Sequence, residues 1–253
     1  MMFGRQREYP TSTTIVSVAG VLLVVASFQF GCDRSKVSSH LPEANVKKQN
    51  LSDQDLMKHV EAFASSDETA AAKAWEVLEK HERQSLIREL TRLYGAAADD
   101  DHHRVLIAFT FCKLKHEYLL NKKVVLSSLA KKSPYKRLYG DWAVSLIHRL
   151  LLGGDTEVLD DLFAAVTWAD GAMATELAGA YSDGLKTDLQ DFLTRLASKS
   201  ADTRRQVYLV LQDNSLTKEE NERVKLFLRS VPPTSNLHRT AQETMKALPS
   251  EDN

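Results

Sequence analysis

Apolar residues return every three or four positions along most of the chain, from about residue 52 to residue 248. This spacing places them on one face of an α-helix, whereas a half-buried strand would alternate apolar and polar residues. Alternating runs bounded by turn residues are nearly missing from the sequence. The pattern therefore predicts helices over residues 52–64, 65–78, 82–94, 101–120, 122–132, 136–152, 156–168, 172–181, 187–197, 202–211, 217–231 and 236–247.

Short polar motifs predict where several of these helices begin and end. Ser52, Ser65, Thr187 and Thr217 each stand three residues before an acid or an amide. In that arrangement a hydroxyl and a carboxyl or amide group satisfy the free backbone N–H groups at a helix start. Gly95 is expected to end the third helix, since glycine commonly follows the last helical residue.

The segment 101–120 is apolar on most of its sides, which predicts one central helix. Cys112 and His116 lie four residues apart in it and so share one face of the predicted helix. One hypothesis is that both side chains bind a single metal ion. A buried thiol beside a core histidine is the commoner outcome of such a pattern. Burial would raise the pKa of the thiol and lower its reactivity.

The composition agrees with an all-α fold. The helix-favouring residues Leu, Ala, Glu, Lys and Arg dominate, and the chain of 253 residues has only 10 glycines and 6 prolines. Trp75, Trp142 and Trp168 are expected to anchor the core between helices.

A faint repeat accompanies the helical pattern. Residues 125–133 resemble residues 192–200, and second helices of successive pairs begin near residues 83, 122, 156, 187 and 217. The spacing of about 30 to 39 residues is typical of helix-pair solenoids. Residues 66–231 therefore resemble, at the level of architecture, a HEAT-type α-solenoid. The resemblance implies helix pairs that bury their apolar faces against neighbouring pairs; an irregular helical bundle is the alternative.

The first 32 residues have the order of an export signal. Arg5 and Arg7 precede an uncharged, mostly apolar run from Ile15 to Phe30, which Gly31 and Cys32 follow. Residues 29–32 resemble a bacterial lipoprotein signal, in which a small residue precedes the cysteine. The resemblance implies that Cys32 is acylated and becomes the mature N-terminus.

Two other outcomes are open for this segment. Cleavage after Ser27 would leave a mature chain that starts at Phe28. Alternatively, residues 13–31 stay uncut as a membrane anchor, since their uncharged length approaches the roughly 20 residues that span a bilayer. The arginines before the anchor would then lie on the cytoplasmic side. In the lipidated and uncut forms, the bulk of the chain is held at the cell envelope and faces the periplasm or the exterior.

The chain is thus expected to have four parts. These are a signal peptide or anchor over 1–31, a flexible polar tether over 32–51, a helical-repeat domain over 52–248 and a disordered tail over 249–253.

Charge excludes one class of partner. Without Arg5, Arg7 and Glu8, the 33 basic and 34 acidic residues of the full chain become 31 and 33, a net charge close to −2. Nucleic-acid binders are usually strongly basic, so no nucleic acid is expected as a partner.

One stretch combines basic and aromatic residues, and one hypothesis is that it binds an anionic partner. Its members are Lys131, Lys132, Tyr135, Lys136, Arg137 and Tyr139. The alternative is a solvated helix junction whose aromatic side chains point inward.

The sequence contains no phosphate-binding loop, dinucleotide fingerprint or nucleophile elbow, and no cofactor is expected. Residues 99–104 form the densest polar cluster, and Asp101, His102 and His103 within it are candidate metal ligands, because imidazole and carboxylate groups suit divalent cations. The simpler interpretation of this cluster is a helix start, where acids complement the helix dipole.

Together these features favour a membrane-tethered, non-enzymatic protein that binds another protein of the bacterial envelope. The alternatives are a metal-dependent hydrolase and an immunity-type partner that blocks a toxin in the periplasm.

Overall fold

The computed structural model describes residues 51–98, 102–130 and 140–249. The chain divides into two units, Met1–Val46 and Lys47–Asn253, and every described residue belongs to the second. The predicted export segment over 1–31, the lipidation site Cys32, the predicted tether as far as residue 50 and residues 250–253 of the predicted tail over 249–253 lie outside the described residues. These features stay predictions.

All regular structure in the described segments is helical, with twelve α-helices and two short 3₁₀ helices and no strand. The predicted all-α fold class is confirmed. In chain order the elements are α1 (Asp53–Ala64), α2 (Glu68–Glu79), α3 (Arg83–Ala96), α4 (His102–Lys113), α5 (Tyr118–Ser127), α6 (Gly140–Leu152), η1 (Thr156–Val158), α7 (Leu159–Ala165), η2 (Val166–Trp168), α8 (Gly171–Thr187), α9 (Leu189–Ala197), α10 (Ala201–Leu211), α11 (Lys218–Ser230) and α12 (His238–Ala247).

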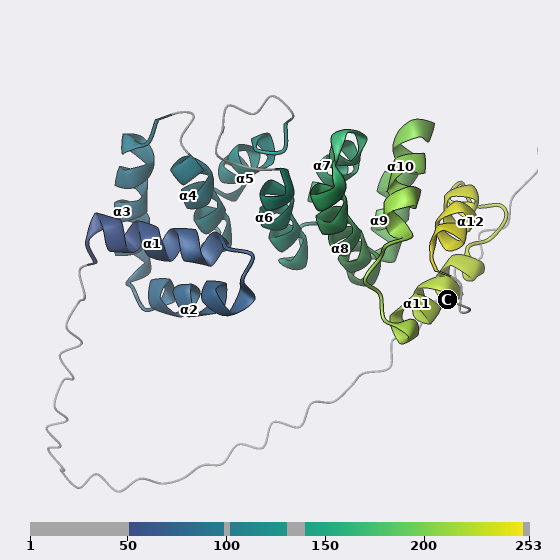
Figure 1. The fold of residues 1–253 in the computed structure, drawn as a ribbon, viewed down its shortest axis with the longest axis horizontal. Coiled ribbons are helices and arrows are strands. Elements are labelled where there is room, and N and C mark those ends of the chain that lie inside the picture. Colours follow the sequence, from purple (N-terminus) through teal and green to yellow (C-terminus); the bar gives the residue numbers. More distant parts are fainter. Residues whose placement is uncertain (1–50, 99–101, 131–139, 250–253) are drawn as a thin grey trace, which may run out of the picture. The chain divides into compact units, whose positions relative to one another are not determined.

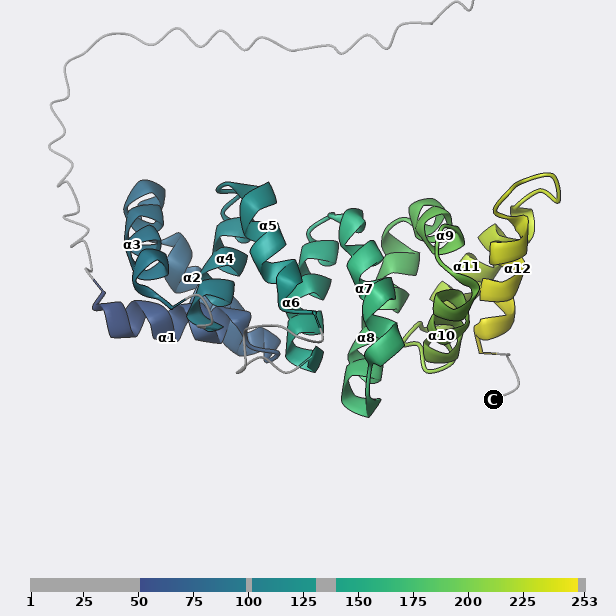
Figure 2. The ribbon, with the colours of Figure 1, turned by 90° about the horizontal axis from the view of Figure 1, so that it is seen from above.

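Within the helical unit, successive helices lie side by side in chain order (Figures 1 and 2). Figure 1 shows α1 running across α3 and α4, and α1 contacts both α2 and α4. Farther along, α6 packs against α8, and α8 packs against α10. These contacts fit both a solenoid of helix pairs and an irregular bundle. Among the helices of the described segments, none combines the length and apolar character that crossing a membrane requires.

Two clusters of aromatic side chains join the helices at separate places. Phe63 of α1 packs against Trp75 of α2 and Phe109 of α4, with ring centroids 5.0 and 5.4 Å apart. Trp142 and Trp168 are also partly buried against the hydrophobic core. All three tryptophans therefore serve as core anchors, as the sequence predicts.

The second cluster joins α7, α8 and α9. The rings of Phe163, Tyr181 and Phe192 lie 5.1 to 6.3 Å apart, and all three side chains are fully buried. The Tyr181 hydroxyl donates a hydrogen bond of 2.9 Å to the carbonyl of Leu162. This bond satisfies a polar group that would otherwise be costly to bury, and burial raises the pKa of Tyr181 well above its ordinary range.

Two of the predicted helix starts are confirmed. The side chain of Ser52 accepts a hydrogen bond from the backbone N–H of Asp55 and caps α1. Thr217 and Glu220 form a reciprocal capping box at α11. Because each motif satisfies its N–H groups locally, the sequence alone specifies these two ends.

The other two predicted starts are wrong. Asp67, not Ser65, caps α2, and Asp188, not Thr187, caps α9. Aspartate is at least as good a cap as serine or threonine, so the acid nearer the helix takes the position. Gly95 does not end α3 either, because the helix continues through it to Ala96.

The predicted single helix over 101–120 is also wrong, because the structure divides it into α4 and α5. Lys115 and Glu117, in the turn between them, have φ angles of 52° and 42°. This left-handed conformation costs non-glycine residues about 1 to 2 kcal/mol.

The end of α4 is a Schellman motif. The His116 N–H donates to the Phe111 carbonyl at 2.9 Å, and the Lys115 N–H donates to the Cys112 carbonyl at 3.0 Å. Lys115 occupies the position that glycine usually takes in this motif. Because residue 115 is not glycine, the sequence carries no signal of the break between α4 and α5.

We expect Gly184→Ala to lower the free energy of unfolding by about 1 to 3 kcal/mol. A Cβ atom at Gly184 would lie 3.0 Å from carbon atoms of both Leu159 and Phe192, which are fully buried. Gly179→Ala, in the same helix, is the matched control, since a Cβ atom there would lie 4.0 Å from the nearest side-chain atom, Cε1 of His148. The control should raise stability by up to about 1 kcal/mol through helix propensity. Thermal unfolding measures both, and equal effects would contradict the close packing of α8 at Gly184.

Candidate functional site

A surface cavity of about 550 Å³ lies where the α4–α5 turn meets the C-terminal end of α6. Its volume lies within the range of ligand-binding pockets. The α4–α5 side contributes Cys112, Lys113, Lys115 and Tyr118, and the α6 side contributes Arg149, Leu150 and residues 153–157.

A second cavity, of about 320 Å³, lies between the same turn and the α2–α3 connection. Trp75, His81 and Arg83 are among the residues that line it. Lys113 and Lys115 line both cavities. The α4–α5 turn therefore separates two neighbouring hollows of the surface.

A buried polar network fixes the wall of the first cavity. The Nζ atom of Lys122 lies 2.8 Å from an oxygen of Asp155 and 2.8 Å from an oxygen of Glu157. The hydroxyl of Tyr118 donates a hydrogen bond to Asp155. The side chains of Lys122 and Asp155 are only 9% and 13% exposed. The network thus ties α5 to the loop that follows α6.

The network keeps its groups in defined protonation states. Burial alone would lower the pKa of Lys122 and raise that of Asp155. Their hydrogen bonds and mutual attraction outweigh burial, so the pKa of Lys122 is raised and that of Asp155 is lowered. Burial, together with the hydrogen bond to Asp155, raises the pKa of Tyr118. At neutral pH, Lys122 and Asp155 are therefore charged and Tyr118 is a hydrogen-bond donor.

Cys112 is buried, as the commoner interpretation of its pattern predicts. Burial and the nearby negative charge of Asp155 raise the pKa of its thiol to about 12. The hypothesis of a metal shared with His116 loses its basis, because α4 ends before His116. The imidazole of His116 instead packs edge-on against Phe111, with ring centroids 5.1 Å apart.

Two arginines near the cavities bind backbone carbonyls at helix ends. Arg83 donates to the carbonyl of Leu114, just past α4. Arg149 donates to the carbonyls of Phe63, at 2.6 Å, and Ser65, at the end of α1. Cations at helix C-termini complement the helix dipole. Burial lowers the pKa of Arg149.

Lys113 and Lys115 differ from these arginines. Both side chains are exposed. Among the described residues, no carboxylate lies within ion-pair distance of either lysine. Their charges are therefore available to a binding partner.

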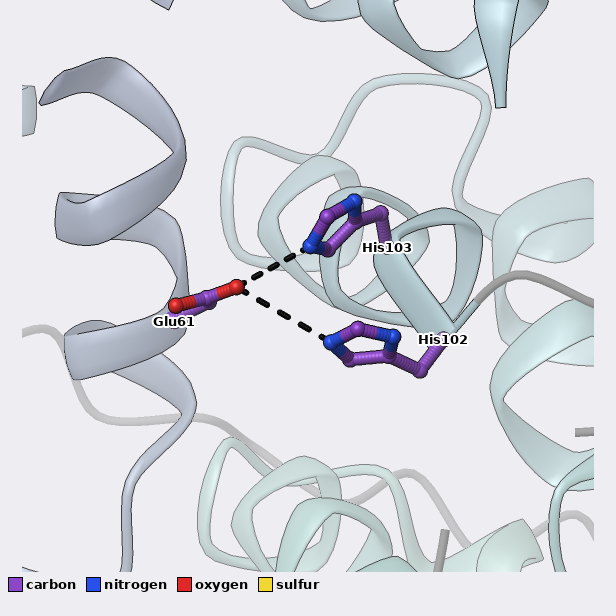
Figure 3. Close-up of side chains that lie close together, drawn as sticks. All are labelled: Glu61, His102 and His103. Atoms are coloured by element: carbon purple, nitrogen blue, oxygen red, sulfur yellow. Dashed lines mark hydrogen bonds and ion pairs between the residues drawn. The ribbon is translucent and has the colours of Figure 1, made fainter. Parts of the chain in front are cut away.

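A separate cluster joins α1 to the first turn of α4 (Figure 3). The Oε1 atom of Glu61 lies 3.0 Å from Nε2 of His103 and 3.8 Å from Nε2 of His102. The two imidazole rings are 4.2 Å apart between centroids. Figure 3 shows both rings directed toward the Glu61 carboxylate. These three residues can hold a metal ion.

The structure thus brings together two of the three predicted metal ligands, His102 and His103, while Asp101 lies outside the described residues. Sequence reasoning missed Glu61, because it belongs to a different helix and only packing of α1 on α4 places it there. The predicted anionic-partner patch also lies outside the described residues and stays a prediction: Lys131, Lys132, Tyr135, Lys136, Arg137 and Tyr139.

Comparisons with protein-family models, with curated proteins and with solved structures found no match to this chain.

We expect Asp155→Asn to lower the free energy of unfolding by about 3 kcal/mol at neutral pH, because it removes a carboxylate from the buried ammonium of Lys122. The pKa of Asp155 is below its ordinary value of 3.8. Its stabilising effect is therefore complete above that value and is lost as the pH falls through the lower folded pKa.

Chemical denaturation at several pH values measures this difference, which should shrink as the pH falls below 3.8 and through the lower pKa of Asp155 in the folded chain. Glu219→Gln, in the exposed pair of Glu219 with Arg223, is the control and should change little. A difference that stays constant with pH would contradict the charged network.

Proposed function

We propose that this chain is a non-enzymatic helical protein, held at a bacterial membrane by its N-terminal segment, that binds another protein of the cell envelope. The order of charge, apolar run, Gly31 and Cys32 supports export and tethering. The two cavities that flank Lys113 and Lys115 support the binding role, and this observation carries the proposal.

Exposed leucines adjoin the first cavity in the sequence. Leu119 and Leu120, which are 67% and 62% exposed, follow the lining residue Tyr118. Leu152, which is 58% exposed, precedes the lining residue Gly153. Exposed apolar side chains beside hollows are typical of protein-binding surfaces. A partner would cover these leucines and insert side chains into the hollows.

The charges favour a partner segment that is both apolar and acidic. Lys122 pairs with Asp155 and Glu157 within the first cavity, and its single positive charge balances one of these two carboxylates. Lys113 and Lys115 therefore supply the positive charge of the surface between the two cavities. Acidic side chains of a partner would pair with these lysines, which gives specificity and orientation to the complex.

The backbone of the α4–α5 turn supports the same conclusion. Lys115 and Glu117 hold left-handed conformations that are unfavourable for side chains other than glycine. Residues in such conformations cluster at functional sites, because the surrounding structure must hold them there. Here the left-handed conformation places Lys115 between the two cavities.

The chemistry of the first cavity favours binding over catalysis. The raised pKa values keep Cys112 and Tyr118 protonated at neutral pH, so neither is a ready nucleophile. Asp155 is held by Lys122 and Tyr118, and its lowered pKa makes it a weak base. These groups are therefore suited to stabilising the cavity wall.

We expect a photo-crosslinking amino acid at position 119 or 152 to form a discrete adduct with one envelope protein in intact cells. Position 226 is the matched control, since Leu226 of α11 is equally exposed at 61% but lines neither cavity. The double variant Lys113→Glu and Lys115→Glu should reduce the adduct at least about tenfold, because it places like charges opposite an acidic segment. Mass spectrometry of the adduct identifies the crosslinked peptide, which should be acidic and apolar.

Three results of this experiment would overturn the proposal. These are no adduct at either position, the same adduct from position 226, or a crosslinked peptide that is basic. An adduct whose yield the charge reversal leaves unchanged would remove the role of the two lysines.

A further inference from the structure

The Glu61, His102 and His103 cluster offers a ligand set that suits one metal well. Two imidazole nitrogens and one carboxylate oxygen converge from α1 and α4. Zinc binds these groups readily, in sites with three protein ligands and one position for water. Calcium and magnesium prefer oxygen ligands alone.

The spacing of the ligand atoms fits a zinc ion. All three atoms lie within 4.8 Å of one another, and the Glu61 oxygen lies 3.0 and 3.8 Å from the two nitrogens. In a tetrahedral site with bonds of 2.0 to 2.1 Å, neighbouring ligand atoms lie about 3.3 Å apart. Small side-chain movements therefore suffice, and the Glu61–His103 contact would become two bonds to the metal.

The cluster is open enough for an ion to enter. The side chains of Glu61, His103 and His102 are 48%, 34% and 20% exposed. Exposure leaves one side of the metal to water, and the packing of α1 on α4 holds the ligands from the other side.

We propose that Glu61, His102 and His103 bind one zinc ion, which clips α1 to α4. α1 is the first described helix after the expected tether; Arg149 binds carbonyls at its C-terminal end, and Arg92 of α3 pairs with Asp53 at its start. A ligand that binds the folded state alone stabilises it, so zinc would strengthen the attachment of α1. None of the three residues lines either cavity, so this proposal is independent of the protein-binding role.

The test uses the full chain, purified in detergent and stripped of metal with a chelator. Zinc chloride is then titrated by calorimetry, and helix unfolding is followed by circular dichroism with and without zinc. We expect one zinc ion per chain and a higher Tm with zinc. Glu61→Gln, His102→Gln and His103→Gln should each weaken zinc binding at least about tenfold and abolish the rise in Tm.

His59→Gln is the matched control, because His59 lies in α1 beside the cluster in sequence but does not belong to it and lines neither cavity. It should bind zinc as the unchanged chain does. Circular dichroism of the metal-free variants checks that each one folds, and glutamine keeps a hydrogen-bonding side chain at every position.

The zinc site is overturned if the unchanged chain binds no stoichiometric zinc, or if the three cluster variants bind zinc as tightly as His59→Gln. Zinc that binds at the cluster without raising the Tm would overturn the clip between α1 and α4.

Discussion

The left-handed backbone of Lys115 is the constraint on which the rest of the candidate surface depends. It ends α4 in a Schellman motif and lets α5 pack back against α4. The reversal places Tyr118 and Lys122 against Asp155, beyond the end of α6. A single helix through residue 120 would remove that network and the cavity it lines. A locally unfavourable conformation thus brings the residues of this network together.

Electrostatics divides the charged groups around this turn into two sets. Lys122 is buried, Asp155 and Tyr118 are half-buried, and the three satisfy one another, while Arg83 and Arg149 bind carbonyls at helix ends. Breaking the Lys122–Asp155 pair is costly, because it leaves a charge unpaired in a buried place. Lys113 and Lys115 form the second set, since both lie exposed on the turn between the hollows. The cavity wall is held by paired polar groups, and exposed charges and leucines lie beside it. This arrangement is suited to recognition of a partner. The zinc clip would act elsewhere, on the attachment of α1.

The sequence predicts those features that local chemistry specifies. Apolar spacing predicts the all-α class and most helices, and the motifs at Ser52 and Thr217 predict two helix starts correctly. The α4–α5 break escapes prediction, because Lys115 stands where a glycine would have marked it. The pairing of Glu61 with His103 also escapes it, because packing between distant helices brings them together. The N-terminal predictions, including Cys32, lie outside the described residues and rest on the sequence alone.

Amide hydrogen exchange measures directly whether the α4–α5 turn and the end of α6 form a protein-binding surface. The full chain is compared in its own envelope membranes and after purification in detergent, with peptides read by mass spectrometry. We expect the amide hydrogens of residues 113–120 and 150–157 to exchange more slowly in the envelope, because a bound partner shields both segments. Equal exchange of these segments in the two states, or protection confined to other helices, would contradict this expectation.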